Sequence, residues 1–185
     1  MKNFISFLLI LIVMYNCDKN DDSITINDNS TAIDEIIPDE VIYSYDESTD
    51  GDLSDSSTSP TSITFELGDN IIVASQTSDG PDYFTFSIPE GYALSQLVVD
   101  DFDVNDPGFI GIANSTVING ATAADLLGGL VYGATNIDED ILPEIGTLNG
   151  ATGFTGVLPS GDYTIWLNQT GSASTATLNF VVTML

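Results

Sequence analysis

Short runs of alternating apolar and polar residues, separated by turn sequences, constrain the fold of this chain more than any other feature. In residues 82–88, DYFTFSI, every second side chain is apolar, which is the period of a half-buried β-strand. Residues 161–168, GDYTIWLN, and 176–184, ATLNFVVTM, repeat the pattern. The residues expected to face the core are Phe84, Phe86, Ile88, Tyr163, Ile165, Leu167, Ala176, Leu178, Phe180, Val182 and Met184.

Five shorter stretches complete the expected set of strands: 41–45, 62–67, 70–75, 93–99 and 109–113. Turn sequences such as SDGPD, PEGY, NDPG and LPSGD stand between the strands. Many short strands without a long helical period predict an all-β protein, an antiparallel jelly-roll β-sandwich. One or two short helical turns are expected in a central insertion, with Thr122 and Asp138 as their N-caps.

The composition excludes several classes of functional site. The chain has no histidine or arginine and only two lysines, against 28 acidic residues, which gives a formal charge of -26. Such a field repels nucleic acid. The absence of histidine excludes a Ser-His-Asp triad and the imidazole ligands of most catalytic zinc sites. Carboxylate chemistry remains: binding of hard cations, or an acid pair acting on a glycosidic bond.

Residues 1–16 have the organisation of an export signal. Lys2 precedes a core that is apolar from Phe4 to Tyr15 except for Ser6, shorter than the roughly 20 residues of a membrane span. The single cysteine, Cys17, follows, and CDKNDD resembles the start of surface lipoproteins of the Bacteroidetes group. The resemblance implies a lipidated Cys17 and a protein held in the outer membrane, exposed on the surface, by its lipid alone. A free thiol after an ordinary secretion signal is the alternative.

Residues 17–40 are expected to form a tether. They are rich in Asp, Asn, Ser and Thr and contain few large apolar side chains other than isoleucine. Such a segment cannot bury enough surface to offset its conformational entropy, and its like charges keep it extended. The folded domain is therefore expected to span residues 41–185.

Three segments of this domain resemble the bacterial pre-peptidase C-terminal domain family. They are YDESTDGDLS at 45–54, DGPDYFTFSIPEG at 79–91 and LPSGDYTIWLNQTG at 158–171. The resemblance implies a jelly-roll β-sandwich that acts as a non-catalytic accessory domain, binding polymers or assisting secretion. Some members of the family bind calcium. No peptidase domain accompanies the module in this sequence, so its own partner is left open.

Two groups of acidic residues are candidate calcium sites. The resemblance would bring the first strand of the domain beside the loop that enters strand 82–88, and with it the carboxylates of Asp46, Glu47, Asp52, Asp79 and Asp82. Acids that converge without basic partners need a cation; a solvated acidic edge is the alternative. The second group, DFDVND at 101–106, begins like an EF-hand loop but lacks its glycine and its final bidentate acid, so a solvated turn is the alternative there.

Trp166 lies on the face of its strand opposite to Ile165 and Leu167. An outward Trp can stack on a sugar ring, which makes Trp166 a candidate ligand-binding residue. It could also pack beneath the long insertion at 105–153.

These observations favour a cell-surface lipoprotein that presents a non-catalytic β-sandwich for binding or adhesion to an extracellular polymer such as polysaccharide. A calcium-stabilised structural or matrix protein is the second hypothesis. A carboxylate-dependent, glycan-active enzyme is a third, minor one.

Overall fold

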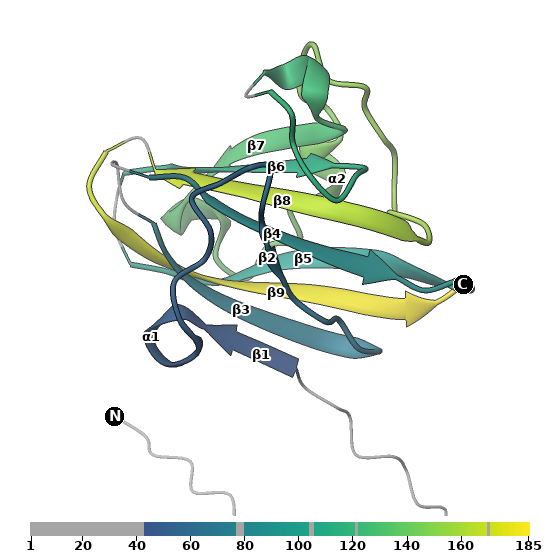
Figure 1. Ribbon diagram of the computed structural model, residues 1–185, viewed down its shortest axis with the longest axis horizontal. Coiled ribbons are helices and arrows are strands. Elements are labelled where there is room, and N and C mark those ends of the chain that lie inside the picture. The colour runs from purple at the N-terminus through teal and green to yellow at the C-terminus, as the bar shows by residue number, and fades with distance from the viewer. Residues whose placement is uncertain (1–42, 77–79, 104–105, 121, 170) are drawn as a thin grey trace, which may run out of the picture. The chain divides into compact units, whose positions relative to one another are not determined.

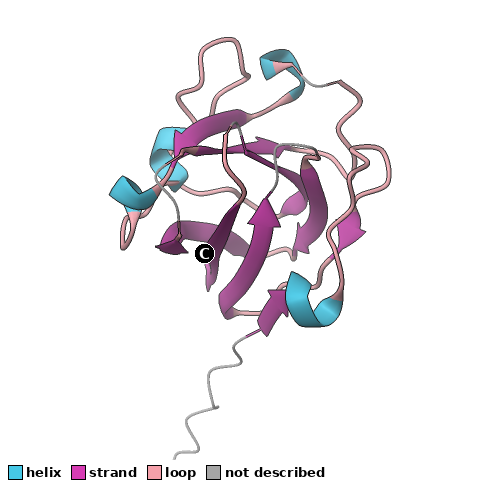
Figure 2. Cartoon of the chain, turned by 90° about the vertical axis from the view of Figure 1, so that its left-hand side faces the viewer, coloured by secondary structure: helices cyan, strands magenta, loops and turns pink. Residues whose placement is uncertain are grey.

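Two β-sheets packed face to face make up the domain (Figures 1 and 2). The computed structural model describes residues 43–76, 80–103, 106–120, 122–169 and 171–185. The first sheet has the order β1-β3-β9-β5, with bounds Tyr43–Asp46, Gly68–Gln76, Ser174–Met184 and Tyr92–Phe102. The second has the order β2-β4-β8-β6-β7, with bounds Thr61–Ser62, Asp82–Ile88, Gly161–Gln169, Gly108–Ala113 and Gly128–Tyr132.

The all-β sandwich is the fold that the alternating pattern predicts. Most neighbouring strands are antiparallel, whereas β1 pairs with β3, and β2 with β4, in parallel at the sheet edges. Within the described residues, four short helices accompany the strands: α1 (Glu47–Asp50), η1 (Ala123–Asp125), η2 (Ala134–Asn136) and α2 (Leu142–Ile145).

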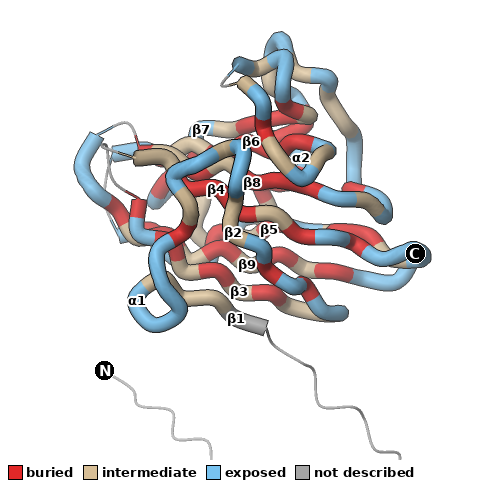
Figure 3. The backbone as a smooth tube through the Cα atoms, in the orientation of Figure 1, coloured by how far each residue is buried: buried red, intermediate tan, exposed pale blue. Residues whose placement is uncertain are grey.

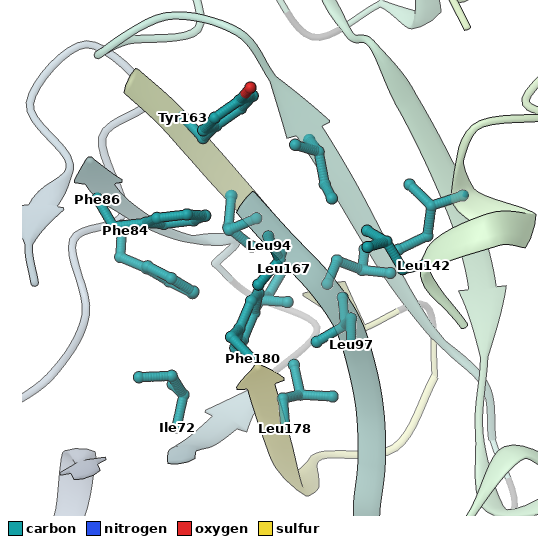
Figure 4. Packing of buried hydrophobic residues seen from close by; sticks show 14 of the residues in the cluster. Ile72, Phe84, Phe86, Leu94, Leu97, Leu142, Tyr163, Leu167, Leu178 and Phe180 are labelled. Carbon is teal, nitrogen blue, oxygen red and sulfur yellow. The ribbon is translucent and has the colours of Figure 1, made fainter. Parts of the chain in front are cut away.

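The core lies between the two sheets, and burial alternates most clearly along β3 and β9 (Figure 3). Phe180 is fully buried on β9, and its ring lies 5.7 Å from that of Phe84 and 6.0 Å from that of Phe86. Figure 4 shows Leu167 and Leu178 in the same cluster. The predicted inward faces are thus confirmed except at Met184, which is 71% exposed at the end of β9.

Of the expected strand 62–67, only Ser62 belongs to a strand, the two-residue β2, and hydrogen bonds explain why β2 ends there. The last backbone bond to β4 runs from the Ile63 N–H to the Thr85 carbonyl, at 2.9 Å. Beyond it, the buried Asn70 side chain accepts from the Glu66 N–H and donates to the Glu66 carbonyl. This amide holds residues 63–67 in a crossing from the second sheet to the first.

Two further expectations need correction in the insertion. α2 begins at Leu142, and Asp140 rather than Asp138 accepts the Leu142 N–H, at 3.1 Å. Asp138 instead adopts a left-handed backbone, with φ 65°. Strand β7 was not expected, because its two glycines interrupt the alternating pattern. Thr122 precedes η1 as predicted, and the Asp125 carboxylate accepts from its hydroxyl.

The insertion packs on the outer side of the second sheet through a smaller apolar cluster. Tyr83, which the alternation places on the solvent side of β4, is only 5% exposed because it lies in this cluster. The other members are Ala113, Ile118 and Leu126, with Phe109, Leu148, Ala151 and Trp166 packed against them.

Candidate metal centre

Three carboxylates from two distant parts of the sequence meet at one end of the sandwich. Glu47 is the first residue of α1, Asp52 follows that helix, and Asp82 is the first residue of β4. One oxygen atom of each lies within 4.8 Å of the others. We call this group the acidic cluster.

Backbone hydrogen bonds bring these segments together. Asp46 ends β1, and its side chain caps α1 by accepting the Ser48 N–H at 2.8 Å. The Glu47 carboxylate then accepts the Leu53 N–H at 2.8 Å, and it also accepts the N–H of Ser75 on β3. These bonds fold the segment after β1 back against the first sheet.

A second set of contacts ties the same segment to the other sheet. The Tyr83 N–H donates to the Ser54 carbonyl at 2.8 Å, in an antiparallel bridge. Thr61 and Ser62 then pair with β4. Residues 47–60 therefore pass from β1 to β2 across one end of the domain (Figure 1).

Asp82 is the most unusual member of the acidic cluster. Its side chain is 4% exposed, and its Oδ2 atom is buried with no hydrogen-bond partner among the described residues. Burial, followed by the charges of Glu47, Asp52 and Asp55, raises the pKa of Asp82 to about 7. An unpartnered buried carboxylate oxygen is unfavourable, so binding of a proton or a cation would stabilise this carboxylate.

Glu47 experiences opposing influences. Its partial burial raises the pKa of its carboxyl group, while the hydrogen bonds from Ser75 and Leu53 lower it, and the net direction is upward. Both lysines precede residue 20, so the described part of the chain offers no basic side chain to the acidic cluster. Among the described residues, the Glu47 carboxylate is compensated by the backbone N–H groups of Leu53 and Ser75.

The donor set fits a hard cation. Calcium prefers six to eight oxygen ligands, from carboxylates, backbone carbonyls and water. Glu47, Asp52 and Asp82 offer carboxylate oxygens only, without the nitrogen or sulfur ligands that favour zinc. Each carboxylate oxygen has a second lone pair, so the hydrogen bonds to Glu47 do not prevent coordination.

Of the five predicted ligands, the structure brings together Glu47, Asp52 and Asp82. Asp46 serves as the helix cap beside them. Asp79 lies outside the described residues, as does the predicted lipidation site Cys17.

Asp55 is a neighbour of the acidic cluster that the sequence reasoning missed. Its charge raises the pKa of Asp82, and a side chain at Gly80 would come within 3.0 Å of its Oδ1 atom. Asp55 belongs to the same acidic run as Asp52. Asp55 lies near Asp82 because Ser54 and Tyr83 form a β-bridge. No local sequence pattern predicts this pairing of two separate segments.

The acids of the second candidate loop make hydrogen bonds to separate groups. Asp103 accepts the Thr175 N–H at 2.7 Å. Asp106 accepts the N–H and the hydroxyl of Ser172, which lowers the pKa of Asp106. Residues 104 and 105 lie outside the described residues. Asp103 and Asp106 thus fasten this loop to residues at the start of β9 and just before it.

Trp166 packs beneath the insertion. Its ring stacks on Tyr83 at a centroid distance of 6.0 Å and meets the Phe109 ring edge-on at 5.1 Å. Its Nε1 atom is buried and has no hydrogen-bond partner within the described part of the chain. This environment matches the packing alternative for Trp166 rather than an exposed stacking platform.

None of the helices within the described ranges is long and apolar enough to cross a membrane. No protein-family model matches the sequence, and no curated protein shows significant similarity to it.

Proposed function

We propose that the protein is a surface lipoprotein that presents a calcium-stabilised, non-catalytic β-sandwich for binding an extracellular polymer, with polysaccharide as the polymer class. The observation that carries the calcium part is the acidic cluster. It combines three converging carboxylates with a buried, unpartnered Asp82 oxygen, and no basic side chain is present in the described residues.

A cation at the acidic cluster would stabilise the fold by linking segments that are far apart in sequence. Glu47 and Asp52 belong to the segment that follows β1, whereas Asp82 begins β4 in the other sheet. A ligand that binds only the folded state at a hundredfold its Kd contributes about 2.7 kcal/mol. For a domain of this size, that corresponds to a rise in melting temperature of several degrees.

The test is thermal unfolding of the purified protein in EDTA, in millimolar Ca²⁺ and in millimolar Mg²⁺ at equal ionic strength. A larger shift with Ca²⁺ than with Mg²⁺ is expected, because Mg²⁺ requires a smaller octahedral shell. Equal shifts would indicate general screening of a highly charged protein and would remove the calcium part of the proposal.

The anchor rests on the leader and Cys17, since two or more acyl chains hold a protein stably on a membrane. Cells expressing the protein should incorporate an acyl analogue into it, and a Cys17→Ser variant should lose the label and leave the membrane fraction or remain unprocessed. If the wild type does not incorporate the acyl analogue, and the Cys17→Ser variant fractionates like the wild type, lipidation is contradicted. Protease treatment of whole cells separates surface exposure from a periplasmic location.

A calcium-stabilised structural or matrix protein is the second candidate, and the acidic cluster favours it equally. Polymer binding discriminates between the two: a structural protein would show the calcium shift without retaining a polysaccharide.

A further inference from the structure

A shallow groove opens along the edge of β4, on the side where β2 ends. It has a volume of 380 Å³, within the range of about 300–1,000 Å³ that is common for small-ligand sites. Its lining comes from residues 62–65, from Thr85, Phe86, Ser87 and Pro89, and from Thr116. We call it the hydroxyl groove.

The short β2 strand creates this opening. β2 pairs with β4 through two residues, Thr61 and Ser62, and the chain then crosses to the first sheet (Figure 1). The part of β4 after Thr85 consequently has no neighbouring strand on this side in the described structure. The buried rings of Phe65 and Phe86, stacked at 4.1 Å, are part of the lining of the groove.

Hydroxyl groups dominate the polar lining. They come from Ser62, Thr64, Thr85, Ser87 and Thr116. Two are already committed within the protein: Thr85 donates to the Tyr163 carbonyl at 2.8 Å, and Ser87 donates to Asp162 at 2.6 Å. The hydroxyls of Ser62, Thr64 and Thr116 make no hydrogen bond within the described residues, and all three residues are exposed.

The lining carries no charged side chain, although the domain is strongly acidic. Glu66 lines the adjoining hollow beside Tyr92, and Asp162 lies behind Ser87. These carboxylates repel an anionic ligand. A lining that combines free hydroxyls with aromatic rings and Pro89 matches a ligand that has both polar groups and apolar C–H faces. A neutral sugar has this chemistry.

We propose that the hydroxyl groove binds a neutral glycan chain, with the free hydroxyls of Ser62, Thr64 and Thr116 contacting the sugar hydroxyls. The inference rests on the polymer-binding role proposed above and adds a location and a ligand class to it. It also separates the binding site from Trp166, which packs in the second apolar cluster.

The test is affinity electrophoresis of the full-length protein in native gels with mild detergent, containing dextran, xylan or mannan as neutral probes and alginate as an anionic probe. At least one neutral polysaccharide should retard the protein, and alginate should not. The triple variant Ser62→Ala/Thr64→Ala/Thr116→Ala should bind that polysaccharide at least tenfold more weakly, because it removes three potential hydrogen bonds.

A matched control is the variant Ser59→Ala/Thr135→Ala/Thr183→Ala, which makes the same chemical changes at exposed residues outside the groove. Both variants should melt like the wild type, since none of the six side chains makes a hydrogen bond in the described structure. Full binding by the groove variant, equal loss by the control, or equal retardation by alginate would overturn the groove assignment and leave polymer binding intact. No retardation by any polysaccharide would remove polymer binding as well, while the calcium and lipidation tests remain independent of it.

Discussion

Replacing Asp82 by asparagine should stabilise the calcium-free protein at pH 8. The wild-type carboxylate is buried beside Glu47, Asp52 and Asp55, and its pKa is raised to about 7, compared with about 4 in an unfolded chain. A difference of this size corresponds to about 4 kcal/mol against the ionised folded state. Water and salt around the outer carboxylates reduce the effect, so we expect a gain of about 2 kcal/mol for Asp82→Asn.

The pH dependence gives the sign of the effect. Between about pH 4 and pH 7, Asp82 keeps its proton in the folded state and loses it in the unfolded state, so the calcium-free protein loses stability as the pH rises. Asparagine has no proton to lose, so in the variant position 82 no longer contributes to the pH dependence of the free energy of unfolding. The two proteins should therefore have similar stability near pH 4 and diverge toward pH 8.

Calcium should reduce the stability advantage of the variant. At a hundredfold its Kd, the ion adds about 2.7 kcal/mol to the wild type, and the variant, which lacks one carboxylate of the acidic cluster, gains less. Urea unfolding at pH 5 and pH 8, in EDTA and in Ca²⁺, compares the two proteins under all four conditions. A variant that is less stable than the wild type in EDTA at pH 8 would refute the reasoning about Asp82.

Two further predictions concern packing. Gly128→Ala should destabilise the protein by about 2 kcal/mol or more in urea unfolding, because the new Cβ would lie 2.1 Å from the Ile145 carbonyl oxygen. Gly133→Ala is the control and should be near neutral, since its Cβ would meet no atom closer than 3.7 Å. Trp166→Phe should cost about 1 kcal/mol of stability, since its Nε1 has no hydrogen bond to lose, and should leave polysaccharide retardation unchanged; a loss of retardation would place the sugar at Trp166.

The core of the sandwich could be predicted because the strand period is local. A side chain two residues along a strand returns to the same face, so the burial of Phe84, Phe86 and Phe180 can be predicted from the alternation alone. The failures occur where a distant contact overrides the period. Tyr83 is covered by the insertion, and the strand expected at 62–67 is cut short by the Asn70 side chain.

The acidic cluster was only partly predictable for the same reason. A run of acids identifies carboxylates but not their spacing in three dimensions. Glu47 and Asp82 approach each other because β1 joins the first sheet and the chain then crosses to the second, and this crossing has no local signature. The resemblance to a known domain family suggested the juxtaposition, and the exact membership depended on bonds such as those between Glu47 and the N–H groups of Leu53 and Ser75.

The acidic cluster and the hydroxyl groove lie along the same edge of β4, which should couple calcium binding to glycan binding. The segment that begins at Asp52 touches β4 first at Tyr83, through Ser54, and then pairs through Thr61 and Ser62. A cation held by Asp52 and Asp82 restrains the beginning of this segment, and Ser62 at its end is part of the lining of the groove.

Because coupling between two ligands is reciprocal, calcium should strengthen retardation by the neutral polysaccharide, and the polysaccharide should lower the Kd for calcium by the same factor. Electrophoresis of the wild type and of Asp82→Asn, in EDTA and in Ca²⁺, measures this factor. The calcium dependence should be lost in the variant, whose groove residues are unchanged. If the variant keeps the dependence of the wild type, calcium acts by screening and the shared segment does not transmit its effect.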